Sequence, residues 1–161
     1  MASTDPRRGP FALVFVLALV AVGLALVTQY RWDMQPCPWC VLQRLIFVLV
    51  GLAALVGLLW RSRAGAWTSV LAISVLSTLG AVAALWQHFV AAASASCNLT
   101  LADRIMSALQ LDALLPEVFA ATASCAEAKA SLLGVPYEFW SLALFILLDA
   151  IAVSAVLRRA A

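Results

Sequence analysis

The stretch FALVFVLALVAVGLALVTQ, residues 11–29, decides the fold, because it runs for 19 residues without a charged side chain. At about 1.5 Å of rise per residue, a helix of this length nearly crosses the ~30 Å hydrocarbon layer of a bilayer. Arg7 and Arg8 precede the stretch, as basic residues precede a secretory signal. The apolar run is longer than the ~7–15 residues usual in such a signal, so we expect a retained membrane span.

Three further apolar runs of similar length follow, at 41–60, 67–86 and 139–157, and only Arg44 and Asp149 bring charge into them. The 161-residue chain is 65% hydrophobic and 11% charged, with a mean hydropathy of +1.03. A soluble domain is about half apolar and about a quarter charged. Because lipid offers no partner to open backbone groups, the sequence predicts an all-α fold. We expect one integral membrane domain, residues 1–161, built as a four-transmembrane-helix bundle.

Basic residues indicate the orientation of the spans. With four spans, both termini and the connection between the second and third spans share one side, and these segments hold six of the ten Lys and Arg residues. The six are Arg7, Arg8, Arg61, Arg63, Arg158 and Arg159. Because basic loops remain in the cytoplasm, we expect both termini there and the loops 30–40 and 87–138 on the opposite, outward side. Trp and Tyr residues near the proposed span ends agree with this topology.

All four cysteines fall in the outward loops: Cys37 and Cys40 in the first, Cys97 and Cys125 in the second. Disulfides persist in such a non-reducing compartment. Structural disulfides that brace the loops are one interpretation, mainly for Cys97 and Cys125. The two-residue spacing of Cys37 and Cys40 closes a very small loop, which favours redox exchange over stabilisation. Zinc is a weaker possibility, and we expect no metal site.

The sequence CPWCVLQR, residues 37–44, predicts a reactive thiol at a helix start. Pro38 suits the first helical position, which puts Cys37 near the cap and Cys40 in the first turn, where free N–H groups stabilise a thiolate. Arg44 follows Cys40 by four residues and shares its helix face, so its charge would favour the thiolate. The alternative is that Arg44 extends to lipid headgroups. An ionisable residue inside a span is by default a functional candidate.

The second outward loop contains its own helix signals. Thr100 to Asp103 fits a capping box, and an apolar face follows it, so a short amphipathic helix is expected, lying either on the membrane surface or on the bundle. Residues 115–119 predict another short turn. Ser124 to Glu127 fits a second capping box, which predicts a helix from Cys125 to about Leu133 with Gly134 as its C-cap.

Electrons leaving these cysteines need an oxidising acceptor. The chain has no Cys-x-x-Cys-His haem signature and no Gly-rich dinucleotide fingerprint. A lipid-soluble quinone needs neither motif and reaches the bundle through the bilayer, close to Cys40 and Arg44. A thiol from the aqueous side and an oxidant from the lipid could therefore both reach this position.

These residues resemble a known family. CPWCVLQR is similar to the Cys-x-x-Cys-x-x-x-Arg signature of the disulfide bond formation protein B family, and PEVFAATASCAEAKASLLG, residues 116–134, is similar to its segment around the last cysteine. The resemblance covers nearly the whole chain. It implies a quinone-dependent thiol oxidase of the bacterial inner membrane, using ubiquinone or menaquinone and a periplasmic DsbA-like thioredoxin-fold partner. No nucleic-acid partner is expected.

The resemblance also implies roles for single residues. Cys97 matches the cysteine attacked by the reduced partner, and Cys125 matches its disulfide partner, which then attacks Cys37. Cys40 matches the thiolate that meets the quinone, and Arg44 matches the arginine of the quinone site. His88 lies where family members often carry a histidine near the quinone, although an interfacial histidine without a role is a close alternative.

One feature departs from the family pattern, and the family pattern does not explain a second. Pro136 lies earlier, relative to Trp140, than the proline that family members often carry before this tryptophan. Asp149 lies too deep in the fourth span to pair with Arg44, so we expect either a hydrogen bond from Ser74, Ser77 or Thr78 or a protonated carboxyl. Two other functions remain open: an enzyme of the vitamin K epoxide reductase type, and a non-enzymatic scaffold with permanent disulfides. The position of the Cys-x-x-Cys pair after the first span argues against the former.

Overall fold

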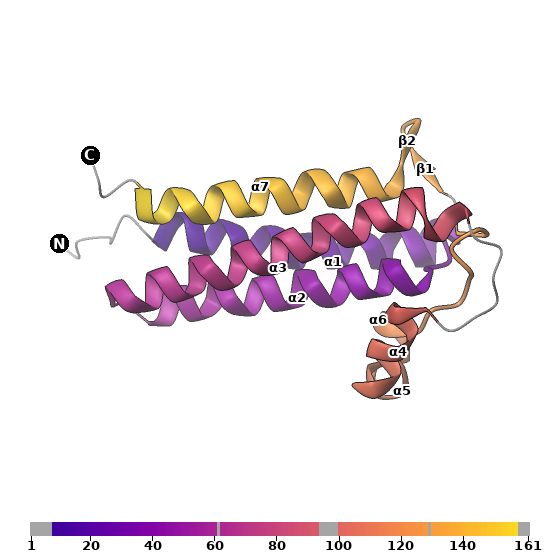
Figure 1. Ribbon diagram of the computed structural model, residues 1–161, viewed down its shortest axis with the longest axis horizontal. Helices are drawn as coiled ribbons and strands as arrows, with labels where there is room; N and C mark the ends of the chain where they lie inside the picture. The colour runs from indigo at the N-terminus through magenta and orange to yellow at the C-terminus, as the bar shows by residue number, and fades with distance from the viewer. Residues whose placement is uncertain (1–7, 61, 94–99, 129, 158–161) are drawn as a thin grey trace.

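Four long helices lie side by side and form the body of the molecule in the computed structural model (Figure 1). The structure describes residues 8–60, 62–93, 100–128 and 130–157. All four helices are long and apolar enough to cross a membrane. They are α1 (Arg8–Trp32), α2 (Pro38–Leu59), α3 (Arg63–Phe89) and α7 (Tyr137–Leu157). The prediction of an all-α, four-span architecture is therefore confirmed.

Capping residues fix where the spans begin and end. Ser62 caps α3, because its side chain accepts a hydrogen bond from the N–H of Gly65 at 2.9 Å. A Cβ on Gly65 would lie 2.6 Å from Trp60, so only glycine allows the close turn between α2 and α3. The first span is longer than the predicted 11–29, since no residue between Arg8 and Trp32 stops the helix.

The helices close into a ring in which α1 packs on α2, α2 on α3, α3 on α7 and α7 on α1. Helix α1 begins and α7 ends at the same end of the bundle (Figure 1). We call the opposite end, where α2 begins, the cysteine end. Large apolar side chains such as Leu24, Leu71 and Ile146 are more than half exposed around the outside. A lipid environment explains this surface, which water would disfavour.

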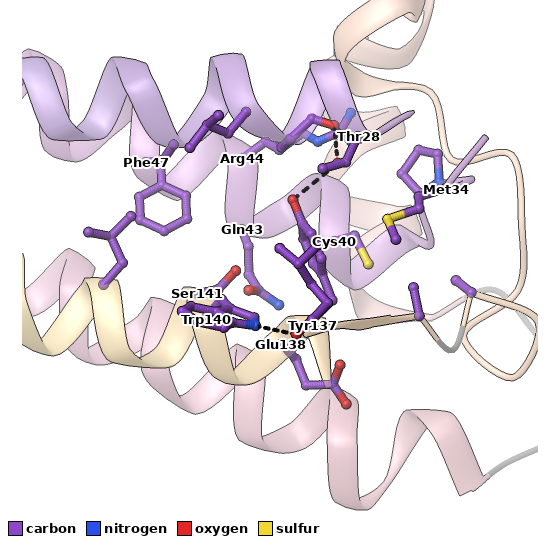
Figure 2. A pocket seen from close by; sticks show the side chains of 18 of the residues that line it. Thr28, Met34, Cys40, Gln43, Arg44, Phe47, Tyr137, Glu138, Trp140 and Ser141 are labelled. Atoms are coloured by element: carbon purple, nitrogen blue, oxygen red, sulfur yellow. Dashed lines mark hydrogen bonds between the residues drawn. The ribbon is translucent and has the colours of Figure 1, made fainter. Parts of the chain in front are cut away.

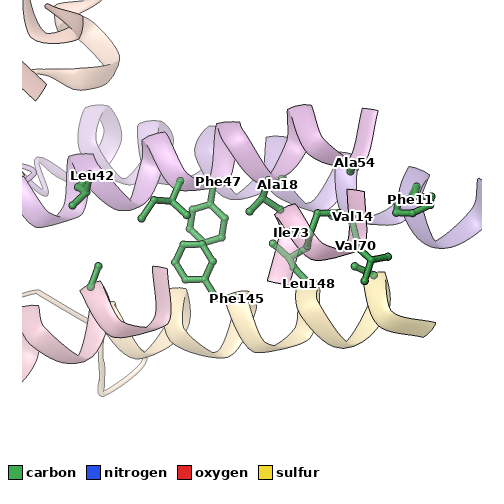
Figure 3. Close-up of a cluster of buried hydrophobic side chains, with 14 of the residues drawn as sticks. Phe11, Val14, Ala18, Leu42, Phe47, Ala54, Val70, Ile73, Phe145 and Leu148 are labelled. Atoms are coloured by element: carbon green, nitrogen blue, oxygen red, sulfur yellow. The ribbon is translucent and has the colours of Figure 1, made fainter. Parts of the chain in front are cut away.

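Aromatic stacking fills the middle of the bundle (Figure 3). The rings of Phe47 and Phe145 lie parallel, with their centroids 4.0 Å apart, between α2 and α7. Helix α3 approaches this pair through Gly80, where a Cβ would come within 2.4 Å of the Phe145 ring. The packing of α3 on α7 therefore depends on a missing side chain.

A polar contact also links α3 and α7 in the span region. The hydroxyl of Ser74 donates a hydrogen bond to Oδ1 of Asp149 at 2.5 Å. This contact confirms Ser74 as one of the predicted partners of Asp149, which is partly buried. Thr78 donates instead to the carbonyl of Ser74, and the Ser77 hydroxyl has no partner within the described residues.

The second loop places three short helices beside α2: α4 (Leu101–Ala108), α5 (Leu111–Leu114) and α6 (Pro116–Phe119) (Figure 1). A one-turn 3-10 helix, η1 (Ala91–Ala93), follows α3. The predicted capping box of α4 is confirmed, with Thr100 and Asp103 hydrogen-bonded reciprocally. Ala102 and Met106 are buried on α2, so α4 packs on the bundle, while Leu101 and Leu109 of its expected apolar face stay exposed.

The predicted helix from Cys125 to Leu133 is wrong. Ser124 and Glu127 do form the capping box, but it supports a single turn. A hairpin follows, in which β1 (Ser131–Leu132) pairs antiparallel with β2 (Val135–Pro136). Leu133 and Gly134 form its tip with φ of 55° and 81°, as a type I′ turn requires. Pro136 also favours extended backbone at Val135, so the last residues of the segment resist a helix.

Candidate active site: a cysteine cluster beside an apolar cavity

Cys37 and Cys40 lie at the first turn of α2, as the sequence predicts. Cys37 is the N-cap, Pro38 follows it at the first helical position, and the Cys37 sulfur accepts a hydrogen bond from the Cys40 N–H at 3.3 Å. The two sulfur atoms lie 2.8 Å apart. Cys37 is fully buried, whereas Cys40 is partly accessible. The cap geometry thus turns both sulfur atoms toward each other.

Cys125 joins this pair from the second loop. The N–H groups of Thr122 and Ala123 donate to the carbonyl of Pro36 at 3.0 and 3.3 Å, which fixes the loop beside the start of α2. The Cys125 sulfur accepts hydrogen bonds from the Cys37 thiol and from the backbone N–H of Trp39. The loop therefore brings together cysteines that are 88 positions apart in the sequence.

These contacts shift the pKa values of Cys125 and Cys37 in opposite directions. The hydrogen bond from the Cys37 thiol, together with the one from the Trp39 N–H, lowers the pKa of Cys125 below the usual thiol value. Hydrogen bonds to Cys125 and Cys40, followed by burial, raise the pKa of Cys37. Cys125 is therefore the readier thiolate and Cys37 the neighbouring proton donor. Cys97 lies outside the described residues.

A cavity of about 490 Å³ lies beside Cys40 (Figure 2), and Cys40 lines it whereas Cys37 and Cys125 do not. Its volume lies within the ~300–1,000 Å³ typical of small-molecule sites. Side chains from α1, α2 and α7 make its walls mostly apolar, including Leu24, Phe47, Leu144 and Leu147. Polar groups gather at the cysteine end, including Thr28, Gln43, Arg44, Gln87, Tyr137 and Glu138. The cavity can hold an apolar molecule with a polar head next to a sulfur.

Arg44 lines this cavity and is only 6% exposed. Its Nη1 donates to Oε1 of Gln29 at 2.7 Å and to the carbonyl of Val118 at 3.0 Å, and its Nη2 donates to the carbonyl of Ala25 at 3.3 Å. The guanidinium therefore binds α1 and α6 and does not extend to lipid headgroups. Its Nε–H is buried without a hydrogen-bond partner in the described part of the chain. A buried unpaired donor carries a free-energy cost that a ligand oxygen would remove.

His88 is not among the residues that line the cavity. Its Nδ1 lies 2.6 Å from Oε1 of Glu138, which does line the cavity, and its ring contacts Phe89 and Phe139. His88 thus approaches the cavity only through Glu138.

Sequence reasoning missed two glutamines of this site. Gln43 Nε2 donates to Gln87 Oε1 at 2.8 Å, and Gln87 Nε2 donates to the Cys40 sulfur at 3.2 Å. Both are buried. Gln43 precedes Arg44 of the motif, and Gln87 precedes His88, which the family resemblance indicated. Buried polar side chains in a span need partners. That requirement is the signal that could have found them.

Known proteins match this chain over nearly its whole length. The family model of "Disulfide bond formation protein DsbB" matches residues 7–155. Similar proteins include Disulfide bond formation protein B of Ralstonia nicotianae, 33% identical over 94% of this chain and 95% of its own length. That of Alkalilimnicola ehrlichii is 34% identical over 96% of each chain. With four membrane-spanning helices and a cysteine cluster, this multi-pass membrane protein belongs to the disulfide bond formation protein B family.

Proposed function

We propose that the chain is a thiol oxidase that re-oxidises a DsbA-like periplasmic dithiol protein and passes the electrons to a membrane quinone. The position of Cys40 carries this proposal, because it lies between the Cys37–Cys125 contact and the apolar cavity. Such an oxidase needs two steps at Cys40: thiol–disulfide exchange with the neighbouring cysteines, and electron transfer to a lipid-soluble acceptor in the cavity. The family membership supports the first step directly.

We infer that the cysteine end faces the periplasm of a bacterial inner membrane, with both termini in the cytoplasm. The basic residues support this orientation, since six of the ten Lys and Arg residues belong, in the sequence, to the two terminal segments and the connection between α2 and α3. An oxidising compartment at the cysteine end lets the disulfides persist.

The exchange sequence begins with a Cys97–Cys125 disulfide. A thiolate of the partner attacks Cys97, Cys125 leaves as thiolate, and the second partner thiolate completes the partner's disulfide. The Cys125 thiolate then attacks the Cys37 sulfur of a Cys37–Cys40 disulfide, which forms the Cys37–Cys125 bond and releases Cys40 as thiolate. Attack by Cys97 on Cys125 restores the first disulfide and frees Cys37. The contact of Cys125 with Cys37 and the hydrogen bond from the Trp39 N–H to the Cys125 sulfur support the middle step, because both remain when Cys37 is bonded to Cys40.

The cavity residues fit a quinone. Apolar walls suit its ring and tail, and the unpaired Nε–H of Arg44 suits a carbonyl oxygen. A bound quinone supplies a two-electron, two-proton acceptor. Arg44 would hold its head near Cys40, and the buried walls would exclude water from the sulfur. Loss of two electrons and two protons from Cys37 and Cys40 to this acceptor would restore their disulfide.

Turnover of the purified chain with a reduced thioredoxin-fold dithiol and either ubiquinone or menaquinone tests the proposal. We expect quinone reduction that disappears in Cys40→Ser. Arg44→Ala is expected to raise KM for quinone by about tenfold or more, since a hydrogen bond from a charged donor contributes ~1.5–3 kcal/mol, while KM for the dithiol stays unchanged. Steady turnover by Cys40→Ser would refute the assignment of Cys40, and an unchanged quinone KM in Arg44→Ala would remove Arg44 from the quinone site.

A further inference from the structure

We propose that Gln87 is a catalytic hydrogen-bond donor that stabilises the Cys40 thiolate, and that Gln43 is a positioning residue that fixes the Gln87 amide. The inference deepens the proposed function and rests on it, because it concerns the state in which Cys40 faces the acceptor. It is carried by two hydrogen bonds that join α2 to α3 at the cavity.

Both amides are buried where the spans would otherwise be apolar. Gln43 is 3% exposed and Gln87 is 6% exposed, and both line the cavity. Burying an amide carries a penalty unless its groups are paired, so two such residues at one site need a specific reason. Pairing with each other satisfies one donor and one acceptor and leaves the Gln87 amide nitrogen for the Cys40 sulfur.

The bond from Gln43 decides which end of Gln87 meets the sulfur. Gln43 Nε2 donates to Gln87 Oε1 at 2.8 Å, so the oxygen of Gln87 is occupied. Its nitrogen therefore points at Cys40 Sγ, 3.2 Å away. With Gln43 as assigned, flipping Gln87 alone would set two N–H donors against each other and an oxygen against the Cys40 thiolate, and both contacts are unfavourable.

The hydrogen bond from Gln87 to Cys40 becomes more important during disulfide exchange. In the structure Cys37 and Cys40 are not bonded to each other, and Cys40 Sγ has the Cys37 sulfur at 2.8 Å and the Gln87 nitrogen at 3.2 Å. Before exchange the two cysteines would form a disulfide. When Cys125 attacks Cys37, the Cys37–Cys125 bond forms, the Cys37–Cys40 bond breaks, and both electrons of the broken bond leave with Cys40. Cys37 then has no proton to donate. Gln87 remains the side chain that donates to this thiolate within the described residues.

Arg44 does not duplicate this role. Its two terminal nitrogens donate to oxygens of α1 and α6, so it provides charge near Cys40 and not a hydrogen bond. Other titratable groups surround the site on every neighbouring element. They are Tyr30 on α1, Cys37 at the N-cap of α2, His88 on α3, Asp103 on α4, Cys125 in the loop, and Tyr137 and Glu138 on α7.

The test is a titration of Cys40 in the full chain, purified in detergent, with Cys37, Cys97 and Cys125 replaced by alanine. Thiolate absorbance and the rate of alkylation are followed against pH. Gln87→Leu removes the amide, and Gln87→Glu keeps the size and the acceptor for Gln43 but loses the donor when ionised. We expect both Gln87 variants to raise the half-titration pH of Cys40 by about one unit or more. At a pH well below this midpoint, the Cys40 thiolate fraction would then be about tenfold smaller. Gln43→Leu is expected to give a smaller shift in the same direction.

Ser77→Ala is the matched control, since Ser77 is also a buried polar residue of α3 but lies away from the cavity, and it should leave the titration unchanged. An unchanged titration in folded Gln87→Glu overturns the inference, even if Gln87→Leu fails to fold. The readout needs no quinone. A shifted titration with no quinone reduction by the native chain supports the Gln87 role and refutes the acceptor. Quinone reduction with an unshifted titration refutes Gln87 alone.

Discussion

At the scale of single residues, the proposed exchange depends on the contact between Cys125 and Cys37. Cys125 accepts hydrogen bonds from the Cys37 thiol and the Trp39 N–H, which lower its pKa, while the same contact with Cys125 raises the pKa of Cys37. In exchange, the nucleophile is a thiolate and its target is a neighbouring disulfide sulfur, and once Cys37 is bonded to Cys40 the Trp39 N–H remains to stabilise the Cys125 thiolate. In the proposed exchange, Cys125 and Cys37 take the roles of nucleophile and target.

The lowered pKa of Cys125 predicts a pH dependence that can be measured on the fully reduced chain. Because a lowered pKa keeps the thiolate as the pH falls below ~8.5, alkylation of Cys125 should persist to lower pH than that of an ordinary thiol. Cys37→Ala removes the main donor and should shift the Cys125 alkylation curve to higher pH, followed by mass spectrometry of the Cys125 peptide. Cys40→Ala leaves both donors in place and should cause no upward shift. Coincident curves for Cys37→Ala and the native chain would contradict this account.

At the scale of elements, the packing of α3 on α7 depends on Gly80. Alanine there would place its Cβ within 2.4 Å of Phe145, whose ring is fully buried against Phe47. We expect Gly80→Ala to lower the free energy of unfolding by about 1–3 kcal/mol, since the stacked rings must move. Thermal unfolding in detergent measures the change.

Gly23→Ala is the control for helix propensity, because a Cβ at Gly23 of α1 meets nothing within 4 Å. It should be neutral or stabilising by up to about 1 kcal/mol. If Gly80→Ala unfolds at the same temperature as Gly23→Ala, the tight approach of α3 to Phe145 does not contribute to stability.

Elements were predictable where their signals are local. The apolar runs predict the spans, and the caps at Thr100 and Cys37 lie where the sequence places them. The segment after Cys125 was not predictable from its cap alone. Leu133 and Gly134 have positive φ, which ends any helix started by the Ser124–Glu127 cap. A leucine rarely adopts positive φ, so its presence in the sequence does not indicate this turn.

At the scale of the whole molecule, the site depends on contacts between distant parts of the chain. Its local half, Cys37, Cys40 and Arg44, could be found from one short motif. The bonds of Arg44 to Gln29 and of Gln43 to Gln87 join residues 15 and 44 positions apart on different helices, and no spacing in the sequence encodes such a pair. The cavity likewise exists only once α1, α2, α3 and α7 have closed around it.

The stoichiometry of electron transfer in oxygen-free proteoliposomes tests the central claim most directly. The chain is reconstituted with a known amount of quinone, reduced thioredoxin-fold dithiol is added outside, and partner disulfide and quinol are counted together. The account predicts one quinol for each partner disulfide, and no disulfide beyond a single turnover once the quinone is extracted. Sustained partner oxidation without quinone, or oxidation that leaves the quinone unreduced, would contradict it.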